Sequence, residues 1–136
     1  MFMRNITLFL FWWFLFFSIS TSSADNEINL DIDENGEYDA LSDGLLIIRY
    51  LFGLTGDDLV SGILGSNSLV VEPIEIKSKL DSMRANLDVD GNGSVDALTD
   101  GLLILRYLFG LRGDSLVTQV IGTGAARNSS ESIEDY

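Results

Sequence analysis

Two stretches of the sequence, roughly 41–52 and 98–109, carry apolar residues at the spacing of an α-helix. Apolar side chains at i, i+4, i+7 and i+11 lie on one side of a helix, and such a stripe normally faces the core. A glycine follows each stretch, at Gly53 and Gly110, as is typical of a helix C-terminus. We therefore expect two helices with core stripes formed by Leu41, Leu45, Ile48 and Phe52 in the first and by Leu98, Leu102, Leu105 and Phe109 in the second.

The other sides of these two helices are also apolar. Each has a leucine and a tyrosine on either side of an arginine: Leu46, Arg49 and Tyr50 in the first, and Leu103, Arg106 and Tyr107 in the second. A helix that is apolar nearly all round is either packed between other elements or in contact with a partner. Both interpretations stay open, because the helices can be buried in the domain, and because arginine and tyrosine are typical anchors of a docking face.

A third helix is expected over about 73–84. Proline is favoured in the first turn of a helix, and Pro73 is the only proline in the chain. The residues after it include an apolar stripe at helical spacing, formed by Ile76, Leu80, Met83 and Leu87. This helix would connect the two halves of the molecule and pack on both of them.

The segments outside these helices predict loops. A Gly-, Ser- and Asn-rich connection spans 61–70. Near the C-terminus, residues 131–134 resemble residues 72–75 at an offset of 59, but only about one helical turn follows. Chain ends with so few residues to pack are usually frayed. We therefore expect 122–136 to be a disordered tail.

An internal repeat organises the chain. Residues 29–60 recur as residues 86–117, at an offset of 57, and the two copies are identical at 24 of 32 aligned positions. Two copies are too few for a solenoid, which needs at least three to bury a continuous core. We interpret them as the halves of a pseudo-twofold pair within one small all-α domain that spans 25–121 and includes the connecting helix.

The N-terminal residues have a composition of their own. Six of the eight phenylalanines and both tryptophans lie in 1–17, where Arg4 precedes an apolar run of about a dozen residues. The run is shorter than the roughly 20 apolar residues of a membrane-spanning helix. Ser22 and Ala24 fit the small-residue positions before a cleavage site. We expect 1–24 to be a signal peptide, with an uncleaved anchor as the alternative, and the protein to be secreted, periplasmic or displayed at the cell surface.

Charge and missing residue types exclude several functions. The chain has neither cysteine nor histidine, so disulfides, Cys or His zinc sites and Ser-His-Asp or Cys-His triads cannot form within it. A net charge of −13 argues against nucleic-acid binding, which needs clustered lysine and arginine. Once the signal peptide is removed, no membrane partner is expected. The acidic balance favours a cation, and a small exported domain without disulfides needs another source of stability, such as bound metal.

An Asp-, Asn- and Gly-rich loop precedes each of the first two helices, at 31–43 and 88–100. Both loops follow the calcium-loop pattern D-x-[DN]-x-[DN]-G, in which alternate residues converge on a hard cation within about 2.5 Å. Gly36 and Gly93 supply the sharp turn at the sixth position. The expected oxygen donors are Asp31, Asp33, Asn35, the Glu37 carbonyl and Asp39 in the first loop, and Asp88, Asp90, Asn92, the Ser94 carbonyl and Asp96 in the second.

The end of each loop departs from the calcium-loop pattern. The twelfth position normally holds a bidentate glutamate, but here it is Ser42 or Thr99, and an aspartate follows at the next position, at Asp43 or Asp100. We expect a loop that is longer by this one position and is closed by the aspartate. The alternative is that the acids only cap the helices and interact with their dipoles. Two copies with every donor in phase favour the metal sites.

These loop-plus-helix units, Asp31–Phe52 and Asp88–Phe109, resemble the type I dockerin family. The resemblance implies a calcium-binding domain that docks onto a cohesin-like partner in extracellular polysaccharide-degrading assemblies. In dockerins the partner contacts come from loop positions 10 and 11 and from basic residues late in the helix. Those positions hold Ala40, Leu41 and Arg49 in the first copy, and Ala97, Leu98 and Arg106 in the second.

We therefore expect a secreted protein-binding module that binds two Ca²⁺ ions per chain. The alternative is a structural or calcium-responsive secreted protein without a cohesin partner. An enzyme is not expected, because the loops already use most of the paired carboxylates and no acid/base pair remains outside them. With the two-fold repeat, Leu46 and Tyr50 of one face and Leu103 and Tyr107 of the other would complete two equivalent partner-binding surfaces.

Overall fold

The computed structural model describes residues 28–136, and within this range the protein consists of helices and loops without a β-strand. The expected all-α class is therefore confirmed, while the expected signal peptide at 1–24 lies outside the described residues. None of the described helices is long and apolar enough to cross a membrane. The helices in chain order are η1 (Ala40–Gly44), α1 (Leu45–Leu51), α2 (Asp57–Val60), α3 (Pro73–Met83), η2 (Arg84–Leu87), η3 (Ala97–Gly101), α4 (Leu102–Leu108), α5 (Asp114–Val117) and α6 (Ser130–Glu134).

Each of the two central helices begins with a π-helical turn, η1 or η3, and continues without a break into α1 or α4. At the end of α1, Gly53 has a φ of 83° and donates its N–H to the Tyr50 carbonyl at 2.8 Å. The N–H of Leu54 bonds to the Arg49 carbonyl at 3.0 Å. This pair of hydrogen bonds ends a helix at a glycine with positive φ, and Gly110 ends α4 in the same way.

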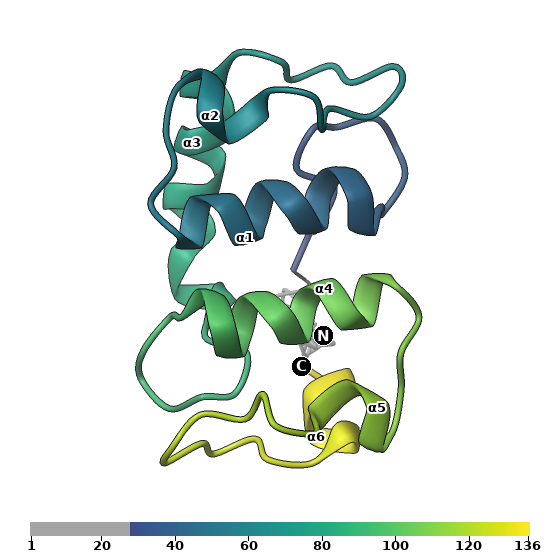
Figure 1. Ribbon diagram of the computed structural model, residues 1–136, viewed down its shortest axis with the longest axis vertical. Coiled ribbons are helices and arrows are strands. Elements are labelled where there is room, and N and C mark those ends of the chain that lie inside the picture. The colour runs from purple at the N-terminus through teal and green to yellow at the C-terminus, as the bar shows by residue number, and fades with distance from the viewer. Residues whose placement is uncertain (1–27) are drawn as a thin grey trace, which may run out of the picture.

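The central helices α1 and α4 lie side by side and run in opposite directions (Figure 1). The helices α2 and α3 cover α1 on one side of this pair, and α5 and α6 cover α4 on the other. Because of the opposite directions, the two acidic loops lie at opposite ends of the central pair. The core is continuous through these layers and includes side chains from both central helices and from their covering elements.

Glycines let the central helices approach closely. A Cβ atom added at Gly44 would lie 2.7 Å from Cδ1 of Leu105, and one added at Gly101 would lie 3.2 Å from Cγ1 of Ile48. At Gly44 an added Cβ would overlap the Leu105 side chain, and at Gly101 it would be in tight contact with Ile48. The absence of a side chain at these two positions therefore allows the helices to pack this closely. Each π-turn is therefore pressed onto the opposite central helix.

The expected core stripe of the central helices is wrong at both ends. Leu41 is 66% exposed and Phe52 is 57% exposed, although the periodicity predicts that both are buried. In the second helix, Leu98 and Phe109 are 63% and 53% exposed. The middle residues of both stripes, including Ile48, are half-buried where the two helices meet.

The buried side of the helix is the one that continues from the acidic loop. Asp43 is fully buried, and Leu46, Ile47 and Tyr50 follow it at i+3, i+4 and i+7 and are also buried. Residues at these spacings share one face of a helix. Because Asp43 must point toward its loop, the face of the helix that carries Asp43 is the face that turns inward. The aspartate therefore determines which apolar residues of the helix are buried.

Residues 122–136 adopt turns followed by helix α6, so the expectation of a disordered segment there is wrong. Helix α6 begins at a capping box, in which the Ser129 hydroxyl accepts the N–H of Ser132 and the Ser132 hydroxyl accepts the N–H of Ser129. Ile133 is only 6% exposed and belongs to the core. The segment folds because the Ile133 side chain anchors α6 to the hydrophobic core.

The correct offset for the tail is 57, the same as for the rest of the repeat. Helix α3 begins at Pro73 and α6 at Ser130, and the buried Ile76 corresponds to the buried Ile133. The offset of 59 instead pairs Ile133 with Ile74, which is 72% exposed. The repeated elements therefore extend beyond 86–117 and include the C-terminal helix.

Candidate metal centres

Three aspartates of the first loop come together. Carboxylate oxygens of Asp31, Asp33 and Asp43 lie within 4.8 Å of one another, with Asp33 and Asp43 fully buried. Asp31 and Asp33 come from the loop itself, and Asp43 comes from the π-turn at the start of the helix. The expected convergence of these three side chains is confirmed, and the cluster can hold a metal ion.

The second loop forms the same arrangement. Asp88, Asp90 and Asp100 also have carboxylate oxygens within 4.8 Å of one another, and Asp90 and Asp100 are fully buried. Each aspartate of this cluster is the counterpart, in the repeat, of an aspartate in the first cluster. The repeat therefore preserves the acidic cluster in three dimensions as well as in sequence.

The π-turn explains why the closing aspartate can lie one position late. The Gly44 N–H bonds to the Asp39 carbonyl at 3.0 Å, which is an i to i+5 bond instead of the usual i to i+4. This wider turn accommodates the extra residue and still points Asp43 into the loop. Gly101 bonds to Asp96 in the same way, also at 3.0 Å. The expectation of a longer loop closed by Asp43 or Asp100 therefore agrees with the structure.

Backbone N–H groups hold the closing aspartate in place. One oxygen of Asp43 accepts the N–H of Ile32 at 2.6 Å, and the other accepts the N–H of Asp39 at 2.9 Å. Asp100 makes the equivalent bonds with Val89 at 2.7 Å and Asp96 at 2.8 Å. The orientation of both carboxylates is thus fixed before any ion binds.

The early part of each loop is also held by its own backbone. Asp31 accepts the N–H groups of Asn35 and Gly36, each at 3.0 Å, and the Asn35 side-chain oxygen accepts the N–H of Glu37 at 2.8 Å. In the second loop the same bonds link Asp88 to Asn92 and Gly93, and Asn92 to Ser94. Asn35, Asn92 and the carbonyls of Glu37 and Ser94 remain predicted ligands.

The ninth residue of each loop contributes its backbone to the loop, and its side chain remains a predicted ligand outside the acidic cluster. Asp39 and Asp96 are exposed, and their carboxylates are outside the two clusters. Their backbones contribute instead, because each N–H bonds to the closing aspartate and each carbonyl accepts the π-turn bond. The sequence pattern places them in the loop correctly, but the structure does not bring their side chains together with the other carboxylates.

The charge of each cluster is not neutralised by a nearby basic side chain. Among residues 28–136, the ion pairs involve Lys77, Lys79 and Arg112, and none of them includes a cluster carboxylate. Burial raises the pKa of Asp43, although the N–H groups of Asp39, Ile32 and Asp33 partly oppose this shift. Burial raises the pKa of Asp100 for the same reason. A bound cation would remove the penalty that burial imposes on these charges.

The connection after α2 covers the first cluster, which the sequence analysis missed. One oxygen of Asp33 accepts the Gly65 N–H at 2.7 Å and the Ser68 hydroxyl at 2.6 Å. A Cβ atom at Gly65 would lie 2.1 Å from Nδ2 of Asn35 and 2.9 Å from a carboxylate oxygen of Asp33, so any larger residue would displace these loop side chains. The signal was present in the sequence, because Gly65 recurs as Gly122 at the offset of 57.

Gly122 covers the second cluster in the same manner. Its N–H bonds to Asp90 at 2.6 Å, and a Cβ atom would lie 2.2 Å from Nδ2 of Asn92. Ser68 has no equivalent here, because Ala125 occupies its place in the repeat. Each acidic loop is therefore closed by a segment from further along the chain, but the serine adds its hydrogen bond only in the first half.

Two basic side chains bind loop carbonyls, and the sequence analysis missed both. Lys79 of α3 donates to the Asp31 carbonyl at 2.6 Å and to the Glu34 carboxylate at 3.0 Å. Arg127 donates to the Val89 carbonyl at 2.5 Å and to the carbonyl of Asp88. These contacts fix the outside of each loop and leave the clustered carboxylates free for a cation.

Half of the ten expected partner-binding residues are buried and unavailable to a partner. Ala40, Leu46, Tyr50, Ala97 and Leu103 are buried in the core, because the rotation set by the closing aspartate turns them inward. Tyr107 is half-buried. The proposed Leu-Arg-Tyr docking face is therefore wrong, and the alternative of burial within the domain is correct.

The two arginines of that expected face have a structural role. Arg49 donates to the carbonyls of Asp58, Leu59 and Ser61 at 3.2, 3.3 and 3.0 Å. Arg106 bonds in the same way to the carbonyls of Ser115, Leu116 and Thr118. Each arginine thus satisfies carbonyls at the end of the short helix that follows, α2 or α5. Of the expected partner residues, Leu41 and Leu98 are the clearly exposed ones.

Comparison with known proteins returns no significant match to a family model, to a curated protein or to a solved structure.

Proposed function

We propose that the protein binds two Ca²⁺ ions, one in each acidic cluster. The observation that carries this proposal is the pair of matched clusters, each with three converging aspartates and no basic partner among the described residues. The donors would be Asp31, Asp33, Asn35, Asp43 and the Glu37 carbonyl in the first site, and Asp88, Asp90, Asn92, Asp100 and the Ser94 carbonyl in the second.

The donor set favours calcium over other metals. Every candidate ligand is an oxygen, and hard cations prefer oxygen, whereas zinc and copper sites use histidine or cysteine, which the chain lacks. Loops with carboxylates, one side-chain amide and a backbone carbonyl suit the six to eight ligands of Ca²⁺. Mg²⁺ requires a stricter octahedron and keeps several waters, so weaker binding of Mg²⁺ is expected.

Calorimetric titration with Ca²⁺ tests this proposal directly. We expect two ions per chain, one for Asp43→Asn, one for Asp100→Asn and none for the double variant. Asp58→Asn is the matched control, because Asp58 is an exposed aspartate outside both clusters, and it should keep two ions. A stoichiometry that stays the same in the Asp43→Asn and Asp100→Asn proteins would contradict the proposal.

We further propose that the calcium-loaded protein is a secreted interaction module of dockerin type. The support is the resemblance of the duplicated loop-plus-helix units together with an exposed apolar surface on the central helices. This outer stripe consists of Leu41, Phe52, Leu98 and Phe109, each more than half exposed. Because η1 packs on α4 and η3 packs on α1, the start of one central helix lies beside the other. Exposed apolar residues gathered on neighbouring elements are typical of binding surfaces.

Binding to immobilised cohesin modules, measured by surface plasmon resonance in excess Ca²⁺, tests this second proposal. We expect Leu41→Ser combined with Leu98→Ser to weaken binding at least ten-fold. Leu69→Ser is the matched control, because Leu69 is 77% exposed but lies in the connection after α2. A protein that binds two Ca²⁺ ions and no cohesin module would instead be a calcium-stabilised structural protein.

A further inference from the structure

The two halves of the molecule differ on the outside of their acidic loops, where three equivalent positions change together. At the offset of 57, the residues Glu34, Val70 and Lys79 of the first half correspond to Gly91, Arg127 and Tyr136 of the second. The backbone at the middle position is the same in both halves. The N–H of Val70 bonds to the Asp33 carbonyl at 3.0 Å, and the N–H of Arg127 bonds to the Asp90 carbonyl at 2.8 Å. The difference therefore lies in the side chains.

In the first half, the basic group comes from the covering helix. Lys79 of α3 donates to the Asp31 carbonyl at 2.6 Å and to the Glu34 carboxylate at 3.0 Å. Glu34 has a φ of 56°, a left-handed conformation that is uncommon for a residue other than glycine. Val70 cannot donate to a carbonyl through its side chain, and it packs against the hydrophobic core instead. The first loop is thus tied to α3.

In the second half, the basic group comes from the connection between α5 and α6. Arg127 donates through Nε to the Val89 carbonyl at 2.5 Å and through Nη2 to the carbonyl of Asp88. The Asp88 carbonyl is the counterpart of the Asp31 carbonyl, so the two basic side chains bind the same atom of the repeat. A Cβ atom at Gly91 would lie 3.1 Å from Cζ of Arg127. The glycine therefore leaves the space in which the guanidinium lies.

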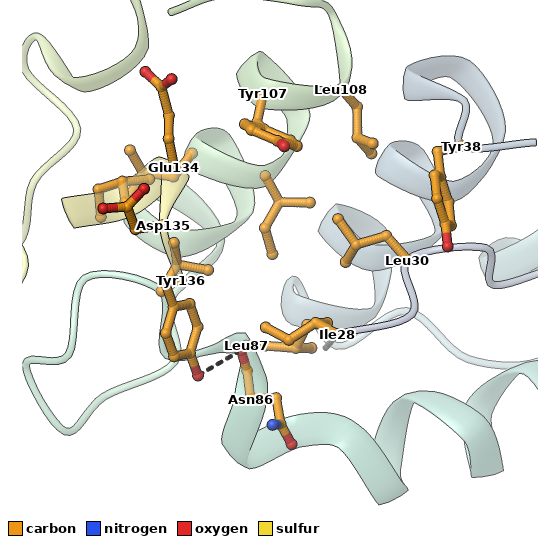
Figure 2. Close-up of a pocket in the computed structure, with 14 residues that line it drawn as sticks. Ile28, Leu30, Tyr38, Asn86, Leu87, Tyr107, Leu108, Glu134, Asp135 and Tyr136 are labelled. Carbon is orange, nitrogen blue, oxygen red and sulfur yellow. Dashed lines mark hydrogen bonds between the residues drawn. The ribbon is translucent and has the colours of Figure 1, made fainter. Parts of the chain in front are cut away.

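Tyr136 has the repeat position of Lys79, and it supports the arginine. The Arg127 guanidinium lies 3.7 Å from the centre of the Tyr136 ring, as in a cation–π contact. Tyr136 also lines a cavity of about 370 Å³ beside α4, and its hydroxyl donates to the Asn86 carbonyl at 3.2 Å (Figure 2). The hydrogen bond fixes the ring, and the ring holds the guanidinium against the loop.

We propose that Lys79 and Arg127 are positioning residues of the two acidic loops, and that each ties ion binding in its loop to a different covering segment. Each holds the carbonyl of the first aspartate of the loop, Asp31 or Asp88. These two aspartates are the half-buried members of their clusters, so an anchor on their backbone matters most there. The effect on the ion rests on the proposed calcium sites, whereas the effect on the ion-free loop does not.

The positive charge of each anchor has an opposing effect, because it repels a cation in the cluster. In the first half, the Glu34 carboxylate lies 3.0 Å from the Lys79 ammonium and reduces this repulsion. In the second half, the charge is delocalised over the guanidinium, which lies against the Tyr136 ring. A hydrogen bond from a charged donor is stronger than one between neutral groups. We therefore expect the hold on the carbonyl to dominate, so that removing either anchor weakens ion binding.

Ca²⁺ titration of the full chain, followed by NMR through the amides of Gly36 and Gly93, reports on each loop separately. Lys79→Met should weaken binding in the first loop by about five-fold or more and leave the second unchanged, and Arg127→Met should do the reverse. Lys79→Arg keeps a charged donor and should retain most of the affinity. Lys77→Met is the matched control, because Lys77 forms its ion pair within α3, and it should change neither site. Unchanged or tighter binding in the first loop of the Lys79→Met protein would overturn the proposal.

A transplant of the second arrangement into the first half tests whether the two anchors are equivalent. Lys79→Tyr alone removes the donor and should weaken the first site as Lys79→Met does. Adding Glu34→Gly and Val70→Arg together rebuilds the arrangement of the second half and should restore the affinity to within about two-fold. Lys79→Tyr with Glu34→Gly alone is the control for relief of the left-handed backbone. A triple variant that binds no better than this control would overturn the equivalence of the anchors.

Hydrogen exchange in the ion-free protein separates the positioning role from the calcium proposal. The amides of Asn35 and Gly36, which bond to the Asp31 carboxylate, should exchange faster in the Lys79→Met protein. The equivalent amides of the second loop should do so in the Arg127→Met protein. Faster exchange in a protein that binds no Ca²⁺ would support the positioning role while the calcium proposal fails. Two bound ions, with exchange and affinities unchanged in both variants, would overturn the positioning role while the calcium proposal holds.

Discussion

The two halves of the molecule are nearly the same at their acidic loops and differ at the helix that covers each central helix. Asp31, Asp33 and Asp43 cluster in the first loop as their counterparts do in the second, and each closing aspartate accepts the equivalent backbone N–H groups. By contrast, α3 is 11 residues long and α6 is 5. Loop geometry allows little variation, because backbone hydrogen bonds fix the clustered carboxylates in both halves.

The largest expected loss of folding stability follows from replacing a closing aspartate, Asp43 or Asp100. The loss should be similar in the two halves. Asp43→Ala and Asp100→Ala each remove an acceptor for three backbone N–H groups. Buried donors left without a partner cost about 1–3 kcal/mol each, so we expect a loss of about 3 kcal/mol or more for either variant. Denaturant unfolding in excess Ca²⁺ measures this loss. The Asp39→Ala protein should lose far less, and unequal losses for Asp43 and Asp100 would show that the halves are not equivalent.

The next effect separates the two halves. Ile76 is fully buried, whereas Ile133 is 6% exposed and lines the cavity beside α4. Isoleucine to alanine in a core costs about 2–5 kcal/mol. We expect Ile76→Ala to lose stability near the upper end of this range. Ile133→Ala should lose only about 2 kcal/mol, because the surroundings of Ile133 are already open on one side. Thermal and denaturant unfolding of both variants tests the difference, and equal losses would mean that the covering helices contribute equally.

A smaller effect concerns the arginines that bind the ends of α2 and α5. Arg49→Met and Arg106→Met keep most of the apolar stem but remove hydrogen bonds to three carbonyls each. We expect each variant to lose about 1–3 kcal/mol, since the bonds involve a charged donor. Unfolding in urea provides the measurement. Lys77→Met, which removes an exposed ion pair with Asp81, should change stability little. Unchanged stability in both arginine variants would revive the docking role that the sequence indicates.

The smallest effect is a local change in acidity. The hydrogen bonds from Lys77 and Tyr50 hold the pKa of Asp81 below its usual value of 3.8. Because the pKa is lower in the folded state, this carboxylate contributes stability above pH 3.8 and loses it as the pH falls further. Tyr50→Phe should raise the Asp81 pKa toward its usual value, as measured by NMR titration of the side-chain carboxyl. Tyr107→Phe should leave it unchanged, and a shift in that variant would contradict the assignment.

The loops and their closing aspartates could be predicted from the sequence, because ligand spacing in a tight turn is set by local geometry. The sequence identifies Asp43 as the residue that closes the loop one position late, and the π-turn supplies the room for it. The predicted helix at 73–84 also agrees closely with α3. Such features depend on residues close in the chain, and composition and spacing describe these well.

The rotation of the central helices could not be predicted from periodicity alone. A helix that is apolar on several sides offers more than one possible core stripe, and the stripe from Leu41 to Phe52 has four apolar residues against three on the buried face. The deciding residue is Asp43, which the sequence presents as a metal ligand and not as a marker of the inward face. Counting i+3, i+4 and i+7 from that aspartate selects Leu46, Ile47 and Tyr50.

The tail could not be predicted because two alignments compete. An offset of 59 aligns residues 131–134 with residues 72–75 and gives three identical residues. An offset of 57 gives one identity in the same residues, between Ile133 and the buried Ile76. Burial, which decides how a segment packs, is not visible in letter identity. The same offset of 57 also makes Gly65 and Gly122 equivalent, and hence reveals the segments that close each loop.

The shared carboxylate of Asp33 has a kinetic consequence. One of its oxygens is bonded to Gly65 and Ser68, and the residue belongs to the cluster that would hold an ion. An ion at this site can leave only when the loop opens, and opening the loop breaks the hydrogen bonds to the connection at the same time. Asp90 has the Gly122 bond without a serine partner. With calcium in both clusters, as proposed, the ion in the first should therefore exchange more slowly than the ion in the second, so that one chain would carry a long-lived and a short-lived calcium.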